Sequence, residues 1–224
     1  MPPALAWSGG KDSALALHAL RGGGREPSVL LTTVTEGVER ISIHGVRREL
    51  LHAQAAAVGI ELVEVRIPLP CPNEVYEQRM AEALARPPLD AVPEIAFGDL
   101  FLEDVRAYRE ERLEPSGRSA LFPLWGRDTA ALARTFLAEG FEALVATVDP
   151  RVLDASFAGR PYDAAFLRDL PPGVDPCGEN GEFHTFVHAG PVFAAPLAVA
   201  TGVVIERDGF VYADIVPVEA AAAA

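Results

Sequence analysis

The sequence predicts an α/β protein in which a mostly parallel sheet carries helices on both faces, with a smaller C-terminal α+β portion. Two observations predict this class. Short apolar runs alternate with segments of helical periodicity through the first 150 residues, which is the pattern of βαβ units. Beyond that point the pattern changes to mixed segments, a polar glycine-rich stretch and a paired set of strand-like runs.

The elements follow one another in a regular order. The apolar run at 4–7 predicts the first strand, and the apolar positions between 14 and 20 form one face of a helix. Glycines at 22–24 end this helix, and a strand follows at 29–34. Further elements are predicted as helix 46–58, strand 61–67, helix 74–85, strand 94–97, helix 103–112, helix 129–139 and strand 143–148. We expect the strands of this series to form the parallel sheet.

A boundary is predicted near residue 150, between a domain at 1–150 and a C-terminal portion at 151–224. Proline, glycine and polar residues are frequent on its C-terminal side. The elements predicted there are a partly helical stretch at 152–170, a hairpin of strands 199–206 and 210–216, and an alanine run at 220–224 that is expected to fray.

Composition restricts the classes of function. The chain is 50% hydrophobic and 23% charged, without a run of about 18 apolar residues or a basic start leading into an apolar stretch, so we expect a cytoplasmic protein with no membrane span. A formal net charge of -13 argues against a nucleic-acid partner, because such proteins display a basic face. Cys71 and Cys177 form no CxxC pair or zinc pattern, and a thiolation relay would require them to meet in the fold.

The most informative segment is Ser-Gly-Gly-Lys-Asp-Ser at residues 8–13, between the first predicted strand and the first predicted helix. A helix N-terminus offers unpaired N–H groups and the positive end of the macrodipole to an anion. Two glycines let the main chain approach that anion, a lysine adds positive charge and two serines add hydroxyls; these residues are Ser8, Gly9, Gly10, Lys11 and Ser13. The alternative is an ordinary turn in which Asp12 or Ser13 caps the helix. The spacing is not that of a Walker A loop, and it favours a pyrophosphate site.

A second polar segment, residues 175–187, reads Asp-Pro-Cys-Gly-Glu-Asn-Gly-Glu-Phe-His-Thr-Phe-Val. Glu179, Glu182 and His184 carry side chains that bind metals, transfer protons or hold an amine. Alternation from Glu182 onward predicts a strand with Glu182 and His184 on one face and Phe183 on the other. The segment alone is equally compatible with a polar loop that has a capping glutamate and a histidine satisfied by a neighbour.

Together the two segments resemble the diphthine-ammonia ligase family of PP-loop (N-type) ATP pyrophosphatases. The resemblance includes Phe-Gly-Asp at 97–99 and Phe-Pro-Leu-Trp-Gly-Arg at 122–127, and it covers almost the whole chain. It implies a Rossmann-like nucleotide domain of the adenine nucleotide alpha hydrolase type. It also implies that Mg-ATP adenylylates a carboxylate with release of pyrophosphate, and that ammonia then attacks to give an amide.

The resemblance also implies roles for individual residues. The ATP phosphates are expected at Ser8, Gly9, Gly10, Lys11, Asp12 and Ser13, and Asp12 is also the candidate Mg²⁺ ligand. The candidate catalytic residues are Lys11, Asp12, Glu179, Glu182 and His184. The candidates for binding the acceptor or ammonia are Gly178, Asn180, Thr185 and Arg127.

Asp99 is a further candidate for the nucleotide site. If the strand order is 3-2-1-4-5, as the resemblance implies, the strand that ends before Gly98 and Asp99 lies next to the first strand. Ligands of open α/β sheets bind at such a switch point. The alternative is that Asp99 caps the following helix.

The second segment departs from the form GEGGEYET that is typical of the diphthamide-making branch, because Asn180, Phe183 and His184 stand here. The histidine adds a group that titrates near neutrality. Chains with ENGEFHTF resemble a branch proposed to act in corrinoid salvage. The expected acceptor is therefore a modified protein histidine or a small corrinoid-like acid, with free ammonia or a separate donor protein as nitrogen source. A tRNA-modifying PP-loop enzyme and a non-catalytic nucleotide sensor remain alternatives, and a homodimer is among the open oligomeric states.

Overall fold

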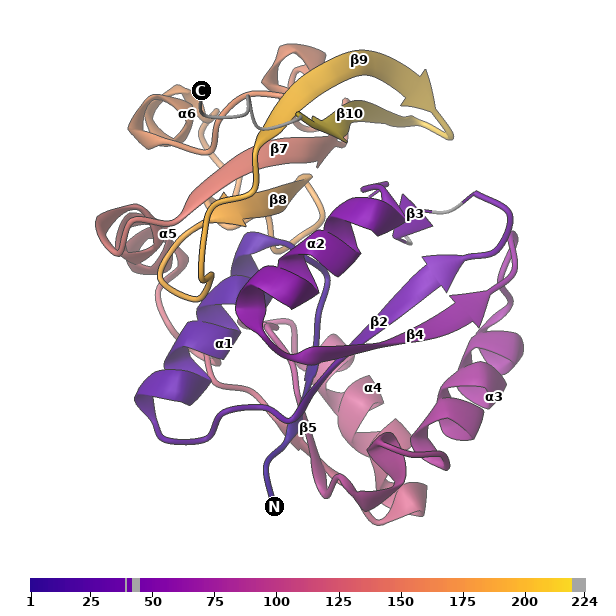
Figure 1. The fold of residues 1–224 in the computed structure, drawn as a ribbon. Coiled ribbons are helices and arrows are strands. Elements are labelled where there is room, and N and C mark those ends of the chain that lie inside the picture. The colour runs from indigo at the N-terminus through magenta and orange to yellow at the C-terminus, as the bar shows by residue number, and fades with distance from the viewer. Residues whose placement is uncertain (39, 42–44, 219–224) are drawn as a thin grey trace, which may run out of the picture.

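The computed structural model describes residues 1–38, 40–41 and 45–218. The strands within these residues form two sheets, one above the other in the view of Figure 1. The alanine run predicted at 220–224 lies outside the described residues. Among the described helices, none has both the length and the apolar character that a membrane crossing requires.

The first sheet confirms the predicted parallel arrangement. Its strands are β1 (Ala4–Ala6), β2 (Val29–Thr35), β3 (Arg40–Ile41), β4 (Glu61–Ile67), β5 (Glu94–Ala96) and β6 (Ser119–Leu121). Strands β4, β2, β1, β5 and β6 lie side by side and parallel, and the short β3 joins β2 antiparallel. Numbered along the chain, the parallel strands have the order 3-2-1-4-5. The ends of β1 and β5 are therefore neighbours at the switch point, as predicted.

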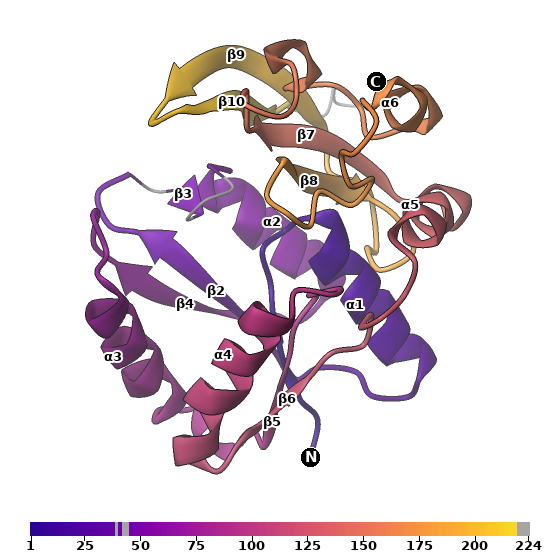
Figure 2. The same ribbon diagram turned by 180° about the vertical axis from the view of Figure 1, so that it is seen from behind.

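Helices cover both faces of this sheet, because successive strand residues bury opposite sides. The helices are α1 (Lys11–Gly22), α2 (Arg48–Val58), α3 (Asn73–Leu84) and α4 (Glu103–Leu113), with short 3-10 turns at Leu89–Ala91 and Glu114–Ser116. Leu5 and Leu30 pack on the side of α1 and α2, whereas Ala4 and Val29 pack on the side of α3 and α4. Figures 1 and 2 show the two helix pairs on opposite faces.

The second sheet is antiparallel and has the order β8-β7-β10-β9. Its strands are β7 (Glu142–Val148), β8 (Phe183–Ala189), β9 (Val199–Arg207) and β10 (Phe210–Pro217). The hairpin of β9 and β10 confirms the predicted pair of strands. Helix α5 (Thr129–Ala138), a 3-10 turn at Ala155–Phe157 and helix α6 (Ala164–Asp169) complete this part.

The placement of the strand at 143–148 in the parallel sheet is wrong, because β7 pairs antiparallel with both β8 and β10. Most of β7 is buried, as a strand of a parallel sheet would be, so its apolar run does not distinguish the two kinds of sheet. The change of sheet falls between β6 and β7. A division of the chain at residue 150 stays a prediction.

Helices α1 and α2 lie between the two sheets and join them into one core. Leu17 of α1 and Leu51 of α2 belong to the same buried cluster as Val145 and Phe186 of the second sheet. This packing places β8 directly against the start of α1, where the main-chain N–H of Val187 donates to the carbonyl of Gly9 at 2.9 Å. The second sheet is thus part of the surroundings of the 8–13 segment.

Candidate nucleotide site

A cavity of about 980 Å³ opens at the carboxyl ends of β1, β2, β4 and β5 and extends between α3 and α4. The predicted site residues that line it are Ser8, Gly10, Lys11, Asp12, Ser13, Asp99, Gly178, Glu179, His184 and Thr185. Residues far apart in the sequence therefore meet at the switch point of the first sheet. The fold brings the two motifs to one cavity.

Four predicted site residues do not line this cavity: Gly9, Asn180, Glu182 and Arg127. Arg127 and Asn180 are exposed, and Glu182 is buried within its own loop. Nearby, the guanidinium of Arg106 lies 4.8 Å from the ring centroid of Trp125. Trp125 of the FPLWGR segment therefore packs against Arg106, whereas Arg127 of the same segment does not line the cavity.

Lys11 and Asp12 form the charged centre of the cavity. The Lys11 side chain is 3% exposed, and its Nζ donates to the two carboxylate oxygens of Asp12 at 3.0 and 2.8 Å. Burial lowers the pKa of Lys11, but Asp12, Cys177 and Glu179 together outweigh this effect, so that pKa is raised and the ammonium keeps its charge. Burial raises the pKa of Asp12 against the opposing effect of Lys11.

Lys11 is the only lysine among the 19 lysine and arginine residues of the sequence. Every other basic side chain of this group is an arginine, so the sequence uses the compact, rotatable ammonium at one position alone. That position is the first residue of α1, where a phosphate would meet the helix N-terminus. An ammonium fits there because its donors turn to any phosphate oxygen, whereas a guanidinium has a fixed fork.

The loop before α1 is braced by its own side chains and by β8. The N–H of Gly10 donates to Ser8 Oγ at 3.3 Å, and Ser13 Oγ donates to the carbonyl of Gly10 at 2.9 Å. The N–H of Lys11 donates to Oγ1 of Thr185 at 3.0 Å. Because Gly10, the N-cap residue, has no side chain, Thr185 from the second sheet caps α1 in its place.

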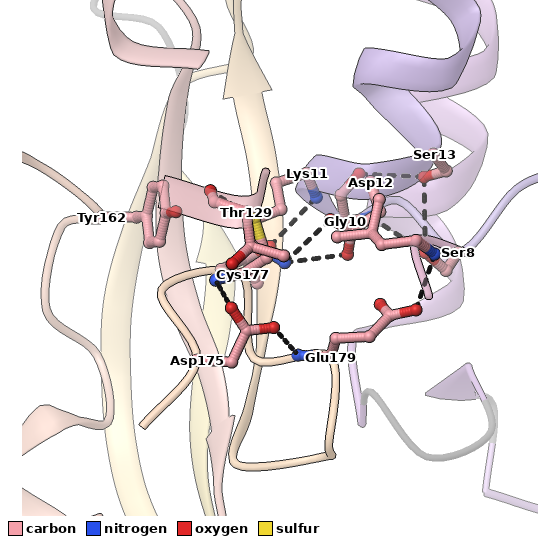
Figure 3. A network of polar contacts seen from close by, with 12 residues as sticks. Ser8, Gly10, Lys11, Asp12, Ser13, Thr129, Tyr162, Asp175, Cys177 and Glu179 are labelled. Carbon is pink, nitrogen blue, oxygen red and sulfur yellow. Dashed lines mark hydrogen bonds and ion pairs between the residues drawn. The ribbon is translucent and has the colours of Figure 1, made fainter. Parts of the chain in front are cut away.

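The loop at 175–182 holds itself in shape (Figure 3). The carboxylate of Asp175 accepts from the N–H groups of Cys177 and Glu179, each at 3.1 Å. The carboxylate of Glu182 accepts from the N–H groups of Asp175 and Asn180, each at 3.0 Å. Glu182 therefore links the two ends of its loop. The prediction that Glu182 and His184 share one face of a strand is wrong, because β8 begins only at Phe183 and His184 alone of the two lines the cavity.

Glu179 faces the cavity across from the 8–13 segment (Figure 3). Its Oε1 accepts from the N–H of Leu100 at 2.7 Å. Burial raises the pKa of Glu179 to about 7, against the opposing effect of the Leu100 N–H. This carboxyl thus exchanges a proton close to neutral pH, which is the property of a general acid or base.

Asp99 lies in the cavity wall and is held by Arg109 of α4. Its carboxylate oxygens accept from Nε and Nη2 of Arg109 at 2.5 and 3.1 Å. The N-cap of α4 is Leu102, without a side-chain hydrogen bond, so the alternative that Asp99 caps this helix is wrong. A Cβ on the preceding Gly98 would lie 2.8 Å from the main chain of Asp12, which shows how closely β5 approaches the loop.

The two cysteines are both free thiols. Cys177 is buried and its Sγ donates to the carbonyl of Thr129 at 3.3 Å. Burial raises the pKa of Cys177 to about 12, so its thiol stays protonated at neutral pH and is a poor nucleophile. Cys71 is half-buried in another part of the cavity wall.

The residues at 1–38, 40–41 and 45–218 include no group of three or more His, Cys, Asp or Glu side chains placed to hold a metal ion. Mg²⁺ needs no such group when it is bound through one carboxylate and the phosphates of a nucleotide. The Asp12 carboxylate is 30% exposed and lines the cavity beside Lys11, so it fits this mode of binding.

The sequence patterns did not identify Gln54, which is fully buried on α2 and hydrogen-bonds to the loop before α1. A signal was present, because Gln54 falls on the apolar face of its helix, four residues after Leu50 and four before Val58. A polar side chain at such a position requires buried partners.

The strand order, the loop at the start of α1 and the cavity beside it define an α/β protein of the PP-loop type. A family model for the diphthamide synthase N-terminal domain matches residues 1–117, and a model for the diphthamide synthase C-terminal domain matches residues 128–219. The chain belongs to the diphthamide synthase family.

A solved structure described as a predicted subunit of tRNA methyltransferase from Methanocaldococcus jannaschii is 20% identical to this chain, with a TM-score of 0.44. The match covers 65% of this chain and 80% of that one. A similarity at this level supports no statement on function. No protein of curated function matches the chain.

Proposed function

We propose that this protein is an ATP-dependent amide-forming ligase that adenylylates a carboxylate and then transfers ammonia to it. Family membership supports ATP pyrophosphatase-type chemistry. The observation that carries the proposal is the cavity, which unites a buried lysine at a helix N-terminus with Glu179, a carboxyl that titrates near neutrality.

In the first step, an oxygen of the acceptor carboxylate attacks the α-phosphorus of ATP, and the bond from that phosphorus to the bridging oxygen of the β-phosphate breaks. Pyrophosphate leaves with its charge stabilised by the Lys11 ammonium and by the N–H groups of α1. Ser8 and Ser13 supply hydroxyls at the same end of the cavity. Asp12 would hold Mg²⁺, which neutralises phosphate charge when it is bound.

In the second step, the nitrogen of ammonia attacks the acyl carbon, the bond from that carbon to the AMP oxygen breaks, and the nitrogen loses a proton. Glu179 is the group that we assign to this proton, because its pKa of about 7 lets it be ionised before the transfer and protonated after it. His184 also lines the cavity and is assigned to the acceptor side.

The family description favours diphthine, a carboxylate on a modified protein histidine, as the acceptor. The ENGEFHTF form of the second motif makes a small corrinoid-like acid the alternative acceptor for the same chemistry. We propose free ammonia as the nitrogen source and the cytoplasm as the compartment.

The test is an exchange assay in which labelled pyrophosphate enters ATP only when an acceptor acid is present. We expect exchange with diphthine or with a corrinoid acid, and a loss of about 100-fold or more in Lys11→Ala. Arg79→Ala is the control, because Arg79 is an exposed cation of α3 outside the cavity lining. Absence of exchange with both acids would contradict the proposal that the protein amidates these acceptors. ATP turnover that is unchanged in a folded Lys11→Ala variant would favour a nucleotide sensor instead.

A further inference from the structure

We infer that Gln54 of α2 is a positioning residue that fixes the peptide unit between Gly9 and Gly10 so that the N–H of Gly10 faces the phosphate site. The inference deepens the proposed function and rests on it in one respect, namely that the 8–13 segment binds the phosphates of ATP.

Gln54 is a polar side chain with no solvent exposure, and its amide bonds to three residues from two separate segments. Its Nε2 donates to the carbonyl of Gly9 at 2.9 Å and to the carbonyl of Val187 at 2.6 Å. Its Oε1 accepts from the indole Nε1 of Trp7 at 3.1 Å. Both donor hydrogens and the acceptor are thus engaged, with the end of β1, the loop and β8.

The carbonyl of Gly9 is held from two sides, because it accepts from Gln54 and from the N–H of Val187, both at 2.9 Å. Gly9 has φ +77, and a Cβ at this position would lie 2.5 Å from Oε1 of Gln54. The backbone therefore packs directly on the glutamine amide. Gly9 does not line the cavity, whereas Ser8 and Gly10 do.

A trans peptide unit points its carbonyl and its N–H in opposite directions. The unit between Gly9 and Gly10 is trans, so a carbonyl turned toward Gln54 and Val187 turns the N–H of Gly10 the other way. That N–H lies beside Ser8 Oγ, which also lines the cavity. Rotation of this unit would aim a carbonyl oxygen at the phosphates, and the two negative groups would repel each other.

Glutamine is suited to this task because it combines two donors with one acceptor. A glutamate would keep the bond from Trp7 but would set a carboxylate against the carbonyls of Gly9 and Val187. A methionine would fill a similar volume with no hydrogen bond. The two substitutions separate the packing of Gln54 from its donors.

The experiment measures the dissociation constants of Mg-ATP and of adenosine for the full chain and for Gln54→Met and Gln54→Glu. Adenosine lacks phosphates, so it reports on the rest of the site. We expect Gln54→Met to weaken Mg-ATP binding by about 10- to 100-fold, which is the value of a hydrogen bond to a charged group, and to change adenosine binding less than about twofold. Gln54→Glu is expected to weaken Mg-ATP binding further. Gln78→Met is the matched control, because Gln78 is exposed on α3 and bonds only to Glu82 among the contacts described.

Equal weakening of both ligands would show a general structural role and overturn the inference, as would unchanged Mg-ATP binding in a folded variant. If Gln54→Met does not fold, Gln54→Glu is measured with the same two ligands; if neither variant folds, the role is structural and the inference fails. A wild-type protein that binds Mg-ATP but shows no acid-dependent exchange contradicts the proposed reaction alone. A wild-type protein that binds no Mg-ATP contradicts both.

Discussion

Glu179 shows how the surroundings of a single residue set its chemistry. Its carboxyl is half-buried at the cavity and receives one main-chain hydrogen bond, from Leu100. Burial disfavours the ionised form more than this bond favours it, so the pKa of Glu179 rises to about 7. Glu182, three residues later, accepts hydrogen bonds from two main-chain N–H groups and stabilises the conformation of its own loop.

The pH dependence of the reaction tests the part of Glu179. If its carboxylate accepts a proton, kcat/KM rises with pH through an apparent pKa of about 7, and Glu179→Gln lowers the rate about 100-fold and removes this limb. Glu111→Gln, an exposed residue of α4, is the control. If the rise of kcat/KM with pH persists in Glu179→Gln, another group causes it.

The folded protein also holds the proton of Glu179 more tightly than the unfolded chain does. The free energy of unfolding therefore falls as pH rises from the ordinary carboxyl range to about 7, and Glu179→Gln removes that fall.

Helix α2 connects the second sheet to the loop before α1. Arg47, its N-cap residue, donates from Nε and Nη2 to the Asp214 carboxylate of β10 at 2.9 and 2.7 Å. Gln54 follows about two turns later and holds the loop. Arg40 of β3 adds a third bond to Asp214 at 3.0 Å. The position of α2, and with it that of the loop, therefore depends on contacts with β10.

Removal of the Asp214 charge is expected to loosen this connection. Asp214→Asn should lower the free energy of unfolding by about 1 to 3 kcal/mol at pH 7, because Asp214 is 13% exposed and accepts charged hydrogen bonds. The bonds from Arg47, and then the bond from Arg40, lower the pKa of Asp214. Its contribution is thus present above the ordinary aspartate pKa and is lost as pH falls through the lowered value. Urea denaturation at pH 7 and at lower pH measures both effects.

The control for this measurement is Asp208→Asn, since Asp208 is 80% exposed at the turn between β9 and β10 and pairs with Arg207 at 3.5 Å. Its effect on the free energy of unfolding should stay within about 0.5 kcal/mol. Equal effects of the two substitutions on the free energy of unfolding would contradict the proposal that Asp214 connects β10 to α2.

For the molecule as a whole, the βαβ periodicity predicted a mostly parallel sheet, whereas the strand order 3-2-1-4-5 and the meeting of the two motifs were implied by the family resemblance. The sequence did not predict the partners of β7, since an apolar strand buried on both sides looks alike in parallel and antiparallel sheets. Gln54 and Asp214 were missed for a different reason. Both side chains bond to distant segments, and although the spacing of Gln54 places it on a buried helix face, local spacing does not identify the partners of either residue.

The charge of the whole molecule predicts which partner it avoids. With a formal net charge of -13, the protein should bind tRNA more weakly than about 10⁻⁶ M at physiological salt. Filter binding over a range of salt concentrations measures this affinity. Tight binding that weakens steeply with salt would contradict the prediction and revive a tRNA-modifying activity.

The single lysine of this sequence has a consequence for how the protein is controlled. Acetylation, ubiquitin conjugation and other lysine-directed modifications find one side-chain target in this sequence, and that target is 3% exposed and paired with Asp12. Lysine modification therefore cannot change the surface charge of this chain in several steps, because the sequence has one lysine. Acetylation of Lys11 would remove the ammonium that donates to the Asp12 carboxylate.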